Sequence, residues 1–307
     1  MFDLSTPKNT ISILKRHGFT NRKAYGQNFL VDKHILDKIL TAAEIEKTDH
    51  VLEIGPGIGT LTGHLAERAG TVVAVEIDKR LIPILHETLA GHDNVSIIQA
   101  DILKIPVTEQ IFNAGPPESS DSPFRGSRIE TLRDDEESSP IKVVANLPYY
   151  ITSPIIMALL EGDVRFGSIT LMLQKEVAQR MLAGPGTKDY GAFSLAVQYH
   201  AAVEIIATVP PSCFIPKPAV ESAIVRLRPH PAPPVDVADE AFFFGLIRAA
   251  FGQRRKTLAN ALMGAKDLGL KRENIIRALH TMELAESIRG EALTLAQFAT
   301  LSWLLSA

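Results

Sequence analysis

The sequence predicts an α/β protein with a doubly wound sheet of seven strands and a small all-helical domain after it. Between about residues 50 and 210, short runs of β-branched residues alternate with helical patterns, as in sheets whose strands are joined by helices. After a proline-rich stretch at 229–236, apolar residues recur at three- and four-residue intervals, which is typical of helices packed on one another. We therefore expect one domain at 1–228 and a second domain at 237–307.

The expected elements follow the chain in order. A helix over 33–43 places Ile35, Leu36, Ile39 and Leu40 on one apolar face, so it should lie against the sheet. Strands are expected at 50–54, 71–76, 95–100, 142–146, 168–173, 203–209 and 223–227, with the last two arranged as in a hairpin. In the second domain, helices are expected at 242–251, 255–265, 272–281 and 295–305, with Phe242, Phe243 and Phe244 in their core.

The charge of the chain is unevenly distributed. Its net charge is −3 at pH 7, but the segment 113–140 alone carries seven acidic and three basic residues. This segment is also rich in proline and serine, which predicts an exposed loop inserted between two strands. Outside it the charges nearly balance, and basic residues outnumber acidic ones in 1–34 and in 211–307. The overall acidity therefore does not exclude a nucleic-acid partner.

Composition argues against several classes of protein. No apolar run reaches the roughly 18 residues that a membrane-spanning helix requires, and the N-terminal segment lacks the apolar block of a signal peptide. Cys213 is the only cysteine and so cannot form a disulfide within the chain, and the histidines show no metal-ligand spacing. We expect a cytoplasmic protein that holds no metal, does not act at a membrane and works as a monomer.

A glycine-rich turn follows the first predicted strand. Residues 51–60 read VLEIGPGIGT, so three glycines stand between the strand and a helix that should begin near Thr60. Glycines let the backbone approach a ligand at the carboxyl end of a strand. The turn differs from the dinucleotide-binding fingerprint, since Gly59 follows Gly57 by two residues rather than three. A nicotinamide-dependent dehydrogenase is therefore disfavoured, although it stays an alternative.

Three acidic residues stand at the ends of successive predicted strands. Glu53 precedes the glycine-rich turn, where it should fix the loop or lie near a cationic ligand group. Glu76 is placed to accept hydrogen bonds from ribose hydroxyls, and Asp101 to accept from an adenine amine. Each acid alone is equally well explained as a solvated strand-end carboxylate. Together they favour S-adenosylmethionine, a nucleoside with a positively charged sulfonium, over NAD with its pyrophosphate.

A second motif follows the fourth predicted strand. It reads NLPYYITSP over 146–154, where the serine–proline pair is typical of a helix start, so the first four residues should form a fixed loop. The Asn146 side chain and the carbonyl group of Leu147 or Pro148 offer acceptors for the two N–H groups of an aminated base. Tyr149 offers a ring for stacking on a base that is flipped or single-stranded. A proline turn beside a buried tyrosine would explain each residue alone, but not the set.

These motifs resemble those of a known family, the KsgA-type ribosomal RNA adenine N6-dimethyltransferases. The similarity extends over nearly the whole chain, in segments that keep the family's order. They are YGQNFL at 25–30, LEIGPGIGTLT at 52–62, VEIDKRL at 75–81, ADIL at 100–103, NLPYYITSPII at 146–156, LMLQKEVAQRM at 171–181, FIPKPAVESAIVRL at 214–227, FGQRRKTLANAL at 251–262 and RGEALTLAQFATL at 289–301. The insertion at 113–140 departs from the family pattern.

The resemblance implies a Rossmann-like class I methyltransferase fold in 1–228 and a helical domain that binds RNA or the ribosome in 237–307. The implied reaction transfers methyl groups from S-adenosylmethionine to N6 of two adjacent adenines near the 3′ end of 16S ribosomal RNA in the small subunit, with a role in small-subunit biogenesis. The residues that it assigns to the cofactor are Asn28, Leu30, Gly55, Glu76, Asp101 and Asn146. Those that it assigns to the target adenine are Asn146, Leu147, Pro148, Tyr149 and Phe214, with Tyr149 and Phe214 stacked on opposite faces of the base.

The same resemblance indicates where RNA binds. It assigns RNA contacts to Arg254, Arg255 and Lys256, which we expect on a helix, together with Lys15, Arg16, Arg22 and Lys23. Without the resemblance, such a cluster is most often a solvated helix face. Gln27 belongs to the N-terminal motif, where it either lines the site or caps the loop before the helix at 33–43.

Two other functions stay open at this point. The related family that methylates an adenine of large-subunit ribosomal RNA and gives macrolide resistance shares the cofactor and the NLPY-like motif. The C-terminal half through RGEAL nevertheless follows the small-subunit type closely. An assembly factor that binds the small subunit, with methylation incidental, would use the same basic surfaces.

Overall fold

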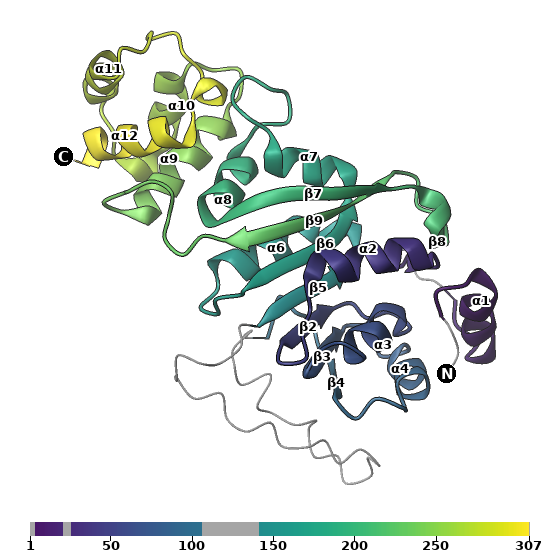
Figure 1. The fold of residues 1–307 in the computed structure, drawn as a ribbon. Helices are drawn as coiled ribbons and strands as arrows, with labels where there is room; N and C mark the ends of the chain where they lie inside the picture. The colour runs from purple at the N-terminus through teal and green to yellow at the C-terminus, as the bar shows by residue number, and fades with distance from the viewer. Residues whose placement is uncertain (1–3, 21–25, 106–140, 307) are drawn as a thin grey trace. The chain divides into compact units, whose positions relative to one another are not determined.

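The computed structural model describes residues 4–20, 26–105 and 141–306 (Figure 1). They divide into two compact units, one with the described residues up to 178 and 204–229, the other with 179–203 and 230–306. The acidic segment 113–140, Arg22 and Lys23 lie outside the described residues. In the part of the chain that is described, no helix combines the length and the apolar character needed to cross a membrane.

The first unit contains a seven-stranded sheet, as the sequence predicts. Its strands, in chain order, are β2 (His50–Ile54), β3 (Thr71–Glu76), β4 (Val95–Gln99), β5 (Lys142–Asn146), β6 (Ser168–Gln174), β7 (Ala201–Val209) and β9 (Ser222–Pro229). Their order across the sheet is β4–β3–β2–β5–β6–β9–β7. Strands β2 to β6 are parallel, and β9 pairs antiparallel with β6. The last two predicted strands are therefore neighbours at one edge.

The strand order places a ligand site beside β2. From β2 the chain runs outward through β3 to β4, and it then returns to the other side of β2 to form β5 and β6. Ligands of α/β sheets usually bind at the carboxyl ends of the strands where the order reverses in this way. The glycine-rich turn follows β2 and the NLPY loop follows β5, so both motifs lie at this switch point.

Helices accompany the strands of the first unit. They are α1 (Pro7–Arg16), α2 (Lys33–Ala43), α3 (Thr60–Ala66), α4 (Ile82–Thr88), α6 (Thr152–Glu161) and α7 (Lys175–Leu182), which runs into the second unit. The apolar spacing predicts the bounds of α2 correctly. Asp32 caps this helix, because its Oδ1 accepts a hydrogen bond of 3.1 Å from the Ile35 N–H. Leu36 and Ile39 of α2 are fully buried in a core cluster with Val51 of β2.

A second, two-stranded sheet was not predicted. β1 (Phe29–Leu30) pairs antiparallel with β8 (Phe214–Ile215), so that Leu30 lies opposite Phe214. The Val31 N–H extends the pairing by donating to the Cys213 carbonyl oxygen at 2.8 Å. Runs of two residues are too short to show a period of alternation, so pattern analysis cannot find such strands.

The second unit is helical, as the sequence predicts. It contains α8 (Ala192–His200), α9 (Glu240–Gly252), α10 (Leu258–Gly264), α11 (Arg272–Thr281) and α12 (Leu295–Ser306). Its core includes Phe243, which is fully buried, with Phe242 and Phe244 packed against it. Residues 179–203 lie with this unit rather than with the first, because Tyr190, Leu195 and Tyr199 are buried in the same core.

The basic cluster Arg254, Arg255 and Lys256 does not lie on a helix, contrary to the expectation. α9 ends at Gly252 and α10 begins only at Leu258, so the cluster occupies the turn between them. The start of α10 is set by Thr257, whose hydroxyl accepts a hydrogen bond from the Asn260 N–H at 3.4 Å. Basic side chains ahead of this cap therefore project from a turn.

Candidate active site

The glycine-rich turn brings the backbone close to its neighbours after β2. The Gly55 N–H donates to the Val75 carbonyl oxygen of β3 at 2.9 Å, which continues the pairing of β2 and β3 beyond the strand. Gly59 has a φ of +87°, and a Cβ there would meet the Thr88 hydroxyl oxygen at 2.9 Å. A larger residue would force the turn away from α4, so glycine is required at this position.

Glu76, at the end of β3, holds this turn in place. Its Oε2 accepts from the Gly57 N–H at 3.2 Å, and its Oε1 accepts from the Asp78 N–H at 2.8 Å. Only 5% of its surface is exposed, and burial raises the pKa of its carboxyl to about 7. The side chain therefore joins the glycine-rich turn to the start of the loop after β3.

Glu53 of β2 is still more deeply buried, with 1% of its surface exposed. Burial raises the pKa of its carboxyl to about 8, and the neighbouring charge of Glu76 acts in the same direction. Its Oε2 has no hydrogen-bond partner among the described residues. The sequence predicts that Glu53 fixes the loop or lies near a cationic ligand group, and Glu53 is not among the residues assigned to the cofactor.

Asp101, two residues beyond the end of β4, is more accessible. Its Oδ1 accepts from the Leu103 N–H at 3.1 Å, and its Oδ2 lies 3.5 Å from the Lys104 ammonium group. A quarter of the side chain is exposed. The carboxylate thus lies at the rim of the site, where a ligand can reach it.

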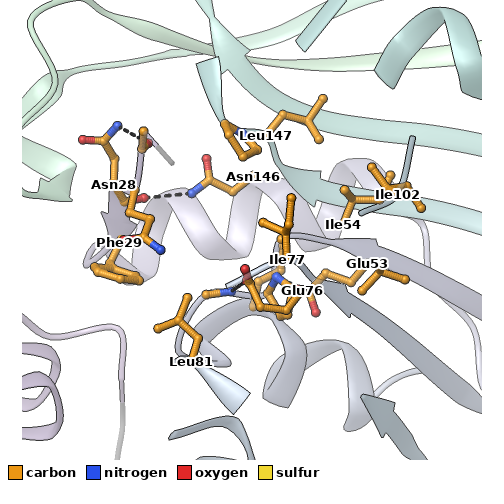
Figure 2. Close-up of a pocket in the computed structure, with 18 of the residues that line it drawn as sticks. Asn28, Phe29, Glu53, Ile54, Glu76, Ile77, Leu81, Ile102, Asn146 and Leu147 are labelled. Carbon is orange, nitrogen blue, oxygen red and sulfur yellow. Dashed lines mark hydrogen bonds between the residues drawn. The ribbon is translucent and has the colours of Figure 1, made fainter. Parts of the chain in front are cut away.

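The NLPY loop begins with Asn146, the last residue of β5. The Asn146 Nδ2 donates to the Asn28 carbonyl oxygen at 3.1 Å, which fixes the orientation of the side-chain amide (Figure 2). The Leu147 N–H donates to the Met172 carbonyl oxygen of β6 at 2.9 Å, and the Pro148 carbonyl oxygen accepts from the Thr152 hydroxyl at 3.0 Å. Strand β6 and the start of α6 therefore hold the loop from both sides.

Tyr149 follows in a short 3₁₀ turn (Tyr149–Ile151) and is partly buried. Its hydroxyl lies 2.6 Å from the hydroxyl of Ser222, the first residue of β9. Burial raises the pKa of this phenol above its ordinary value. Sequence reasoning did not identify Ser222, because β9 lies far away in the sequence and a serine in a strand carries no signal of its own.

The N-terminal motif reaches the site through Asn28 and Gln27. The Asn28 Nδ2 donates to the Gly26 carbonyl oxygen at 3.0 Å, which stabilises the backbone whose Asn28 carbonyl accepts from Asn146. The Gln27 Nε2 donates to the Asp78 Oδ2 at 2.9 Å, and Arg80 also binds this carboxylate. Gln27 therefore contacts the loop after β3, whereas the cap of α2 is Asp32. Asp78 was not predicted.

One cavity brings nearly all of the predicted site residues together. The lining includes each residue assigned to the cofactor and most of those assigned to the target base, namely Asn28, Leu30, Gly55, Glu76, Asp101, Asn146, Leu147, Pro148 and Tyr149. Glu53 and Gln27 also line it. Figure 2 shows Asn28 and Asn146 from one side of this cavity and Glu53 and Glu76 from another. Among the described residues that line it, three carry carboxyl groups and none is lysine, arginine or histidine.

Phe214 does not line this cavity. It is 1% exposed and lies in the core cluster that contains α2, opposite Leu30 in the two-stranded sheet. The ring therefore supports the strand that carries Leu30. The ring does not reach the cavity wall, and its contact with the target adenine stays a prediction.

The predicted RNA-binding residues differ in how they are held. Arg254 pairs with Glu291 at 3.2 Å and donates to the Lys188 carbonyl oxygen at 2.8 Å, so it connects segments of the second unit. Arg255 and Lys256 are exposed. In the first unit, Lys15 is exposed on the last turn of α1, and the neighbouring Arg16 pairs with Glu87.

The described residues contain no group of three or more histidine, cysteine, aspartate or glutamate side chains that could hold a metal ion. The three carboxyls of the cavity therefore do not form a metal centre. Their chemistry matches a ligand with a positive charge and with hydroxyl or amine groups that donate hydrogen bonds.

Comparison with known proteins agrees with this geometry. The family model described as ribosomal RNA adenine dimethylase matches residues 18–300. The ribosomal RNA small subunit methyltransferase A of Lachnoclostridium phytofermentans is 52% identical over 300 residues, which cover 97% of this chain and 96% of that protein. The crystal structure of a dimethyladenosine transferase from Plasmodium falciparum is similar with a TM-score of 0.69 and 27% identity, covering 89% of this chain and 95% of that one. That of the 23S rRNA methyltransferase ErmE has a TM-score of 0.63 and 28% identity, with coverage of 91% and 100%.

These similarities confirm the predicted methyltransferase fold. They extend across both units, since the matched residues begin before the glycine-rich turn and end within α12. The extent of the match, together with one cavity that joins the strand-end carboxyls to the NLPY loop, leads to one conclusion. The chain belongs to the ribosomal RNA adenine dimethylase family, and it is a methyltransferase, as its motifs predict.

Proposed function

We propose that this enzyme transfers methyl groups from S-adenosylmethionine to N6 of two adjacent adenines near the 3′ end of 16S ribosomal RNA, giving N6,N6-dimethyladenosines in the small subunit. The observation that carries the proposal is the single cavity that contains both the cofactor motifs and the NLPY loop. The small-subunit target is supported by the higher similarity to a small-subunit methyltransferase, at 52% identity, than to a 23S enzyme, at 28%.

The cavity fits S-adenosylmethionine on chemical grounds. Its described lining has three carboxyls and no basic side chain, and the Glu53 Oε2 is buried without a partner. The lining offers no basic side chain to pair with a pyrophosphate, whereas its carboxyls can pair with the positive charge of a sulfonium nucleoside. This comparison disfavours the dehydrogenase alternative.

Residues of the first unit would hold the cofactor as follows. Glu76 would accept from the ribose hydroxyls, and Asp101, at the rim, would accept from the adenine amine. Asn28 and Leu30 would form the opposite wall, and Gly55 would leave the backbone open to the ligand. Bound S-adenosylmethionine would supply an electrophilic methyl group.

The target adenine would be bound by the NLPY loop. The Asn146 Nδ2 donates to the Asn28 carbonyl oxygen, which fixes the side-chain amide, and the Oδ1, its only acceptor atom, would accept from the target amine. The Pro148 carbonyl already accepts from Thr152, which favours the Leu147 carbonyl as the second acceptor. Tyr149 would stack on the flipped base.

These contacts would act by alignment. Two acceptors on the amine N–H groups direct the nitrogen lone pair toward the methyl group, and the proton can leave to solvent after transfer. No strong general base is needed for this reaction. Dimethylation requires that the loop readmit an adenine that already carries one methyl group.

The second unit would bind the small subunit through RNA phosphates, with Arg255 and Lys256 as exposed contacts. Arg254 would contribute mainly by holding the turn, because it pairs with Glu291. We expect a monomer that acts in the cytoplasm, where small subunits assemble.

The decisive experiment is methyl transfer from labelled cofactor to isolated small subunits, followed by mapping of the modified nucleotides. Label in two adjacent adenines near the 3′ end of 16S rRNA is expected. Label in 23S rRNA would support the macrolide-resistance type instead. An Asn146→Ala variant that restores subunit maturation without methylation would show that assembly is the main function.

A further inference from the structure

The NLPY loop is followed by a second tyrosine, Tyr150, to which the function proposed above gives no role. The two tyrosines are consecutive residues of one 3₁₀ turn, yet their surroundings differ. Tyr149 is partly buried, lines the cavity and is held by Ser222. Tyr150 is 51% exposed, more than any other large apolar side chain in the described part of the chain. A single exposed ring is ordinary on a protein surface, so its meaning depends on where it lies.

Tyr150 lies next to the cavity, between two of the segments that line it. The residues before and after it, Tyr149 and Ile151, both line the cavity, and so does Gly26 of the N-terminal motif. The ring of Tyr150 contacts Gly26, since a Cβ on that glycine would lie 3.4 Å from the tyrosine Cδ1. Gly26 has a φ of +55°, a conformation that also favours glycine. The exposed ring is therefore held beside the cavity, where the NLPY loop meets the N-terminal motif.

The position of the target base determines what the neighbouring part of the RNA strand requires. An adenine that is flipped onto the NLPY loop leaves the stack that it formed with the bases on either side. The described lining of the cavity has no lysine, arginine or histidine, so nothing there attracts the phosphates of the strand. The neighbouring nucleotides therefore stay outside the cavity, and one of them can use an aromatic ring beside it as a new stacking partner.

We propose that Tyr150 is a substrate-binding residue that stacks on the base adjacent to the target adenine in the RNA strand. This inference rests on the proposed function and adds a second base contact to it. Because the two proposed targets are adjacent adenines, each is the neighbour of the other when that other one occupies the NLPY loop. Tyr149 and Tyr150 would then hold consecutive bases. The contact contributes to binding and presenting the substrate, and it leaves cofactor affinity unchanged.

The rival explanation is that the Tyr150 ring only covers the backbone at Gly26. Three variants separate packing from stacking. Tyr150→Phe keeps the ring, Tyr150→Leu keeps apolar bulk over Gly26 without an aromatic plane, and Tyr150→Ala removes both. The control is Leu304→Ala, which removes an apolar side chain, 38% exposed, from α12 of the second unit. Melting temperatures show whether each variant is folded, and the leucine variant keeps the test valid if the alanine variant is unstable.

The experiment measures kcat/KM for methyl transfer to three kinds of small subunit. Because the proposed targets lie near the 3′ end of 16S rRNA, that end can be replaced by a ligated synthetic segment. One segment has both adenines, the second has an abasic residue in place of the first adenine, and the third has it in place of the second. Each abasic substrate keeps one target but removes the neighbouring base on one side. Calorimetry with S-adenosylmethionine is performed on every variant.

On the natural substrate, Tyr150→Phe and Leu304→Ala should resemble the wild type, whereas Tyr150→Leu and Tyr150→Ala should lose about fivefold or more in kcat/KM. Affinity for S-adenosylmethionine should be the same in all of them. With one of the two abasic substrates, the wild type should fall to the level of Tyr150→Leu, and Tyr150→Leu should lose nothing further. That substrate identifies whether the stacked base lies on the 5′ or the 3′ side of the target.

Two results would overturn the proposal. If Tyr150→Leu is as active as Tyr150→Phe, the side chain acts through packing on Gly26. If Tyr150→Leu loses the same factor on all three substrates, the ring does not contact the neighbouring base. Failure of the proposed function gives a different result, because the wild type itself would then leave the adenines of the natural substrate unmethylated, and the stacking role would be wrong with it.

Discussion

The hydroxyl group of Tyr149 lies 2.6 Å from the hydroxyl group of Ser222, so the residue expected to stack on the target base is held by the first residue of β9. Ser222 is fully buried. The bond therefore fixes the direction of the Tyr149 ring from inside the fold and leaves its faces for other contacts. This relationship makes the tyrosine a rigid support for a base, and it determines how variants at 149 should behave.

Changing Tyr149 to alanine should impair methylation far more than cofactor binding. Stacking on a base is worth about 1–3 kcal/mol, so the loss in kcat/KM for small subunits should be about 5- to 150-fold. Phenylalanine keeps the ring but leaves the Ser222 hydroxyl buried without its partner, so activity should recover with slightly lower stability. If Tyr149→Ala loses cofactor affinity as severely as Asn146→Ala, the tyrosine supports the loop and the stacking role is wrong.

Asn146→Ala should weaken both cofactor binding and methyl transfer. The variant loses the bond from the side-chain nitrogen to the Asn28 carbonyl, which is part of the cofactor wall, and it loses the Oδ1 acceptor for the target amine. Calorimetry should show weaker S-adenosylmethionine binding, and methyl transfer should fall by about a hundredfold or more. Normal cofactor affinity together with abolished transfer would restrict the role of Asn146 to the target side.

The basic residues of the turn before α10 should have two different roles, RNA binding for Arg255 and Lys256 and stability for Arg254. Neutralising Arg255 and Lys256 should raise the KM for small subunits and flatten its salt dependence by roughly one unit of slope per lost phosphate contact. Arg254→Ala should instead lower the melting temperature, because Arg254 binds Glu291 and the Lys188 carbonyl. Lys266→Gln, in the same unit, serves as the charge control. An unchanged salt slope in the Arg255 and Lys256 variants would make them ordinary solvated residues.

Phe214 offers a test of core packing against base stacking. Because its ring is buried opposite Leu30, Phe214→Ala should destabilise the first unit by about 3–5 kcal/mol in chemical unfolding. Phe214→Leu should restore most of this stability, since it refills the same space. If methylation returns with Phe214→Leu, the residue acts through packing. If methylation stays low in a stable Phe214→Leu variant, the aromatic ring contacts the adenine.

The acidic segment 113–140 should be dispensable for methyl transfer. Seven acidic residues against three basic ones would repel RNA, so the segment is not expected at the RNA-binding face. Replacing it with a short Gly/Ser linker should leave kcat/KM for small subunits within about twofold. A large loss of activity in a variant with an unchanged melting temperature would show that the segment contributes to function.

The seven-stranded sheet could be predicted from the sequence, because its strands are long enough for their runs of β-branched and apolar residues to be recognised. The bounds of β2, β3 and β5 agree with the prediction, and so do those of α2 and α11. Each of these elements has a clear apolar pattern that ends at a polar or glycine-containing segment. The location of the candidate site residues at strand ends could be predicted for the same reason, since the end of a strand defines their position.

What the sequence could not predict depends on pairing between distant segments. The β1–β8 pair and the bond between Gln27 and Asp78 join residues that show no local period. The start of α10 was predicted too early because basic residues are good helix formers, and the Thr257 cap determines the true start. The burial of Phe214 likewise depends on its partner Leu30 in the fold.

The pairing of Leu30 with Phe214 also has a consequence for synthesis of the protein. Leu30 lines the candidate cofactor cavity, yet its strand partner is synthesised only after the whole parallel part of the sheet. Contacts of such large sequence separation form late, because a long loop must close first. A nascent chain that stops before residue 214 therefore lacks β8, the strand that pairs with β1 and supports the Leu30 side of the cavity. The growing enzyme should acquire full cofactor affinity only when that segment has emerged.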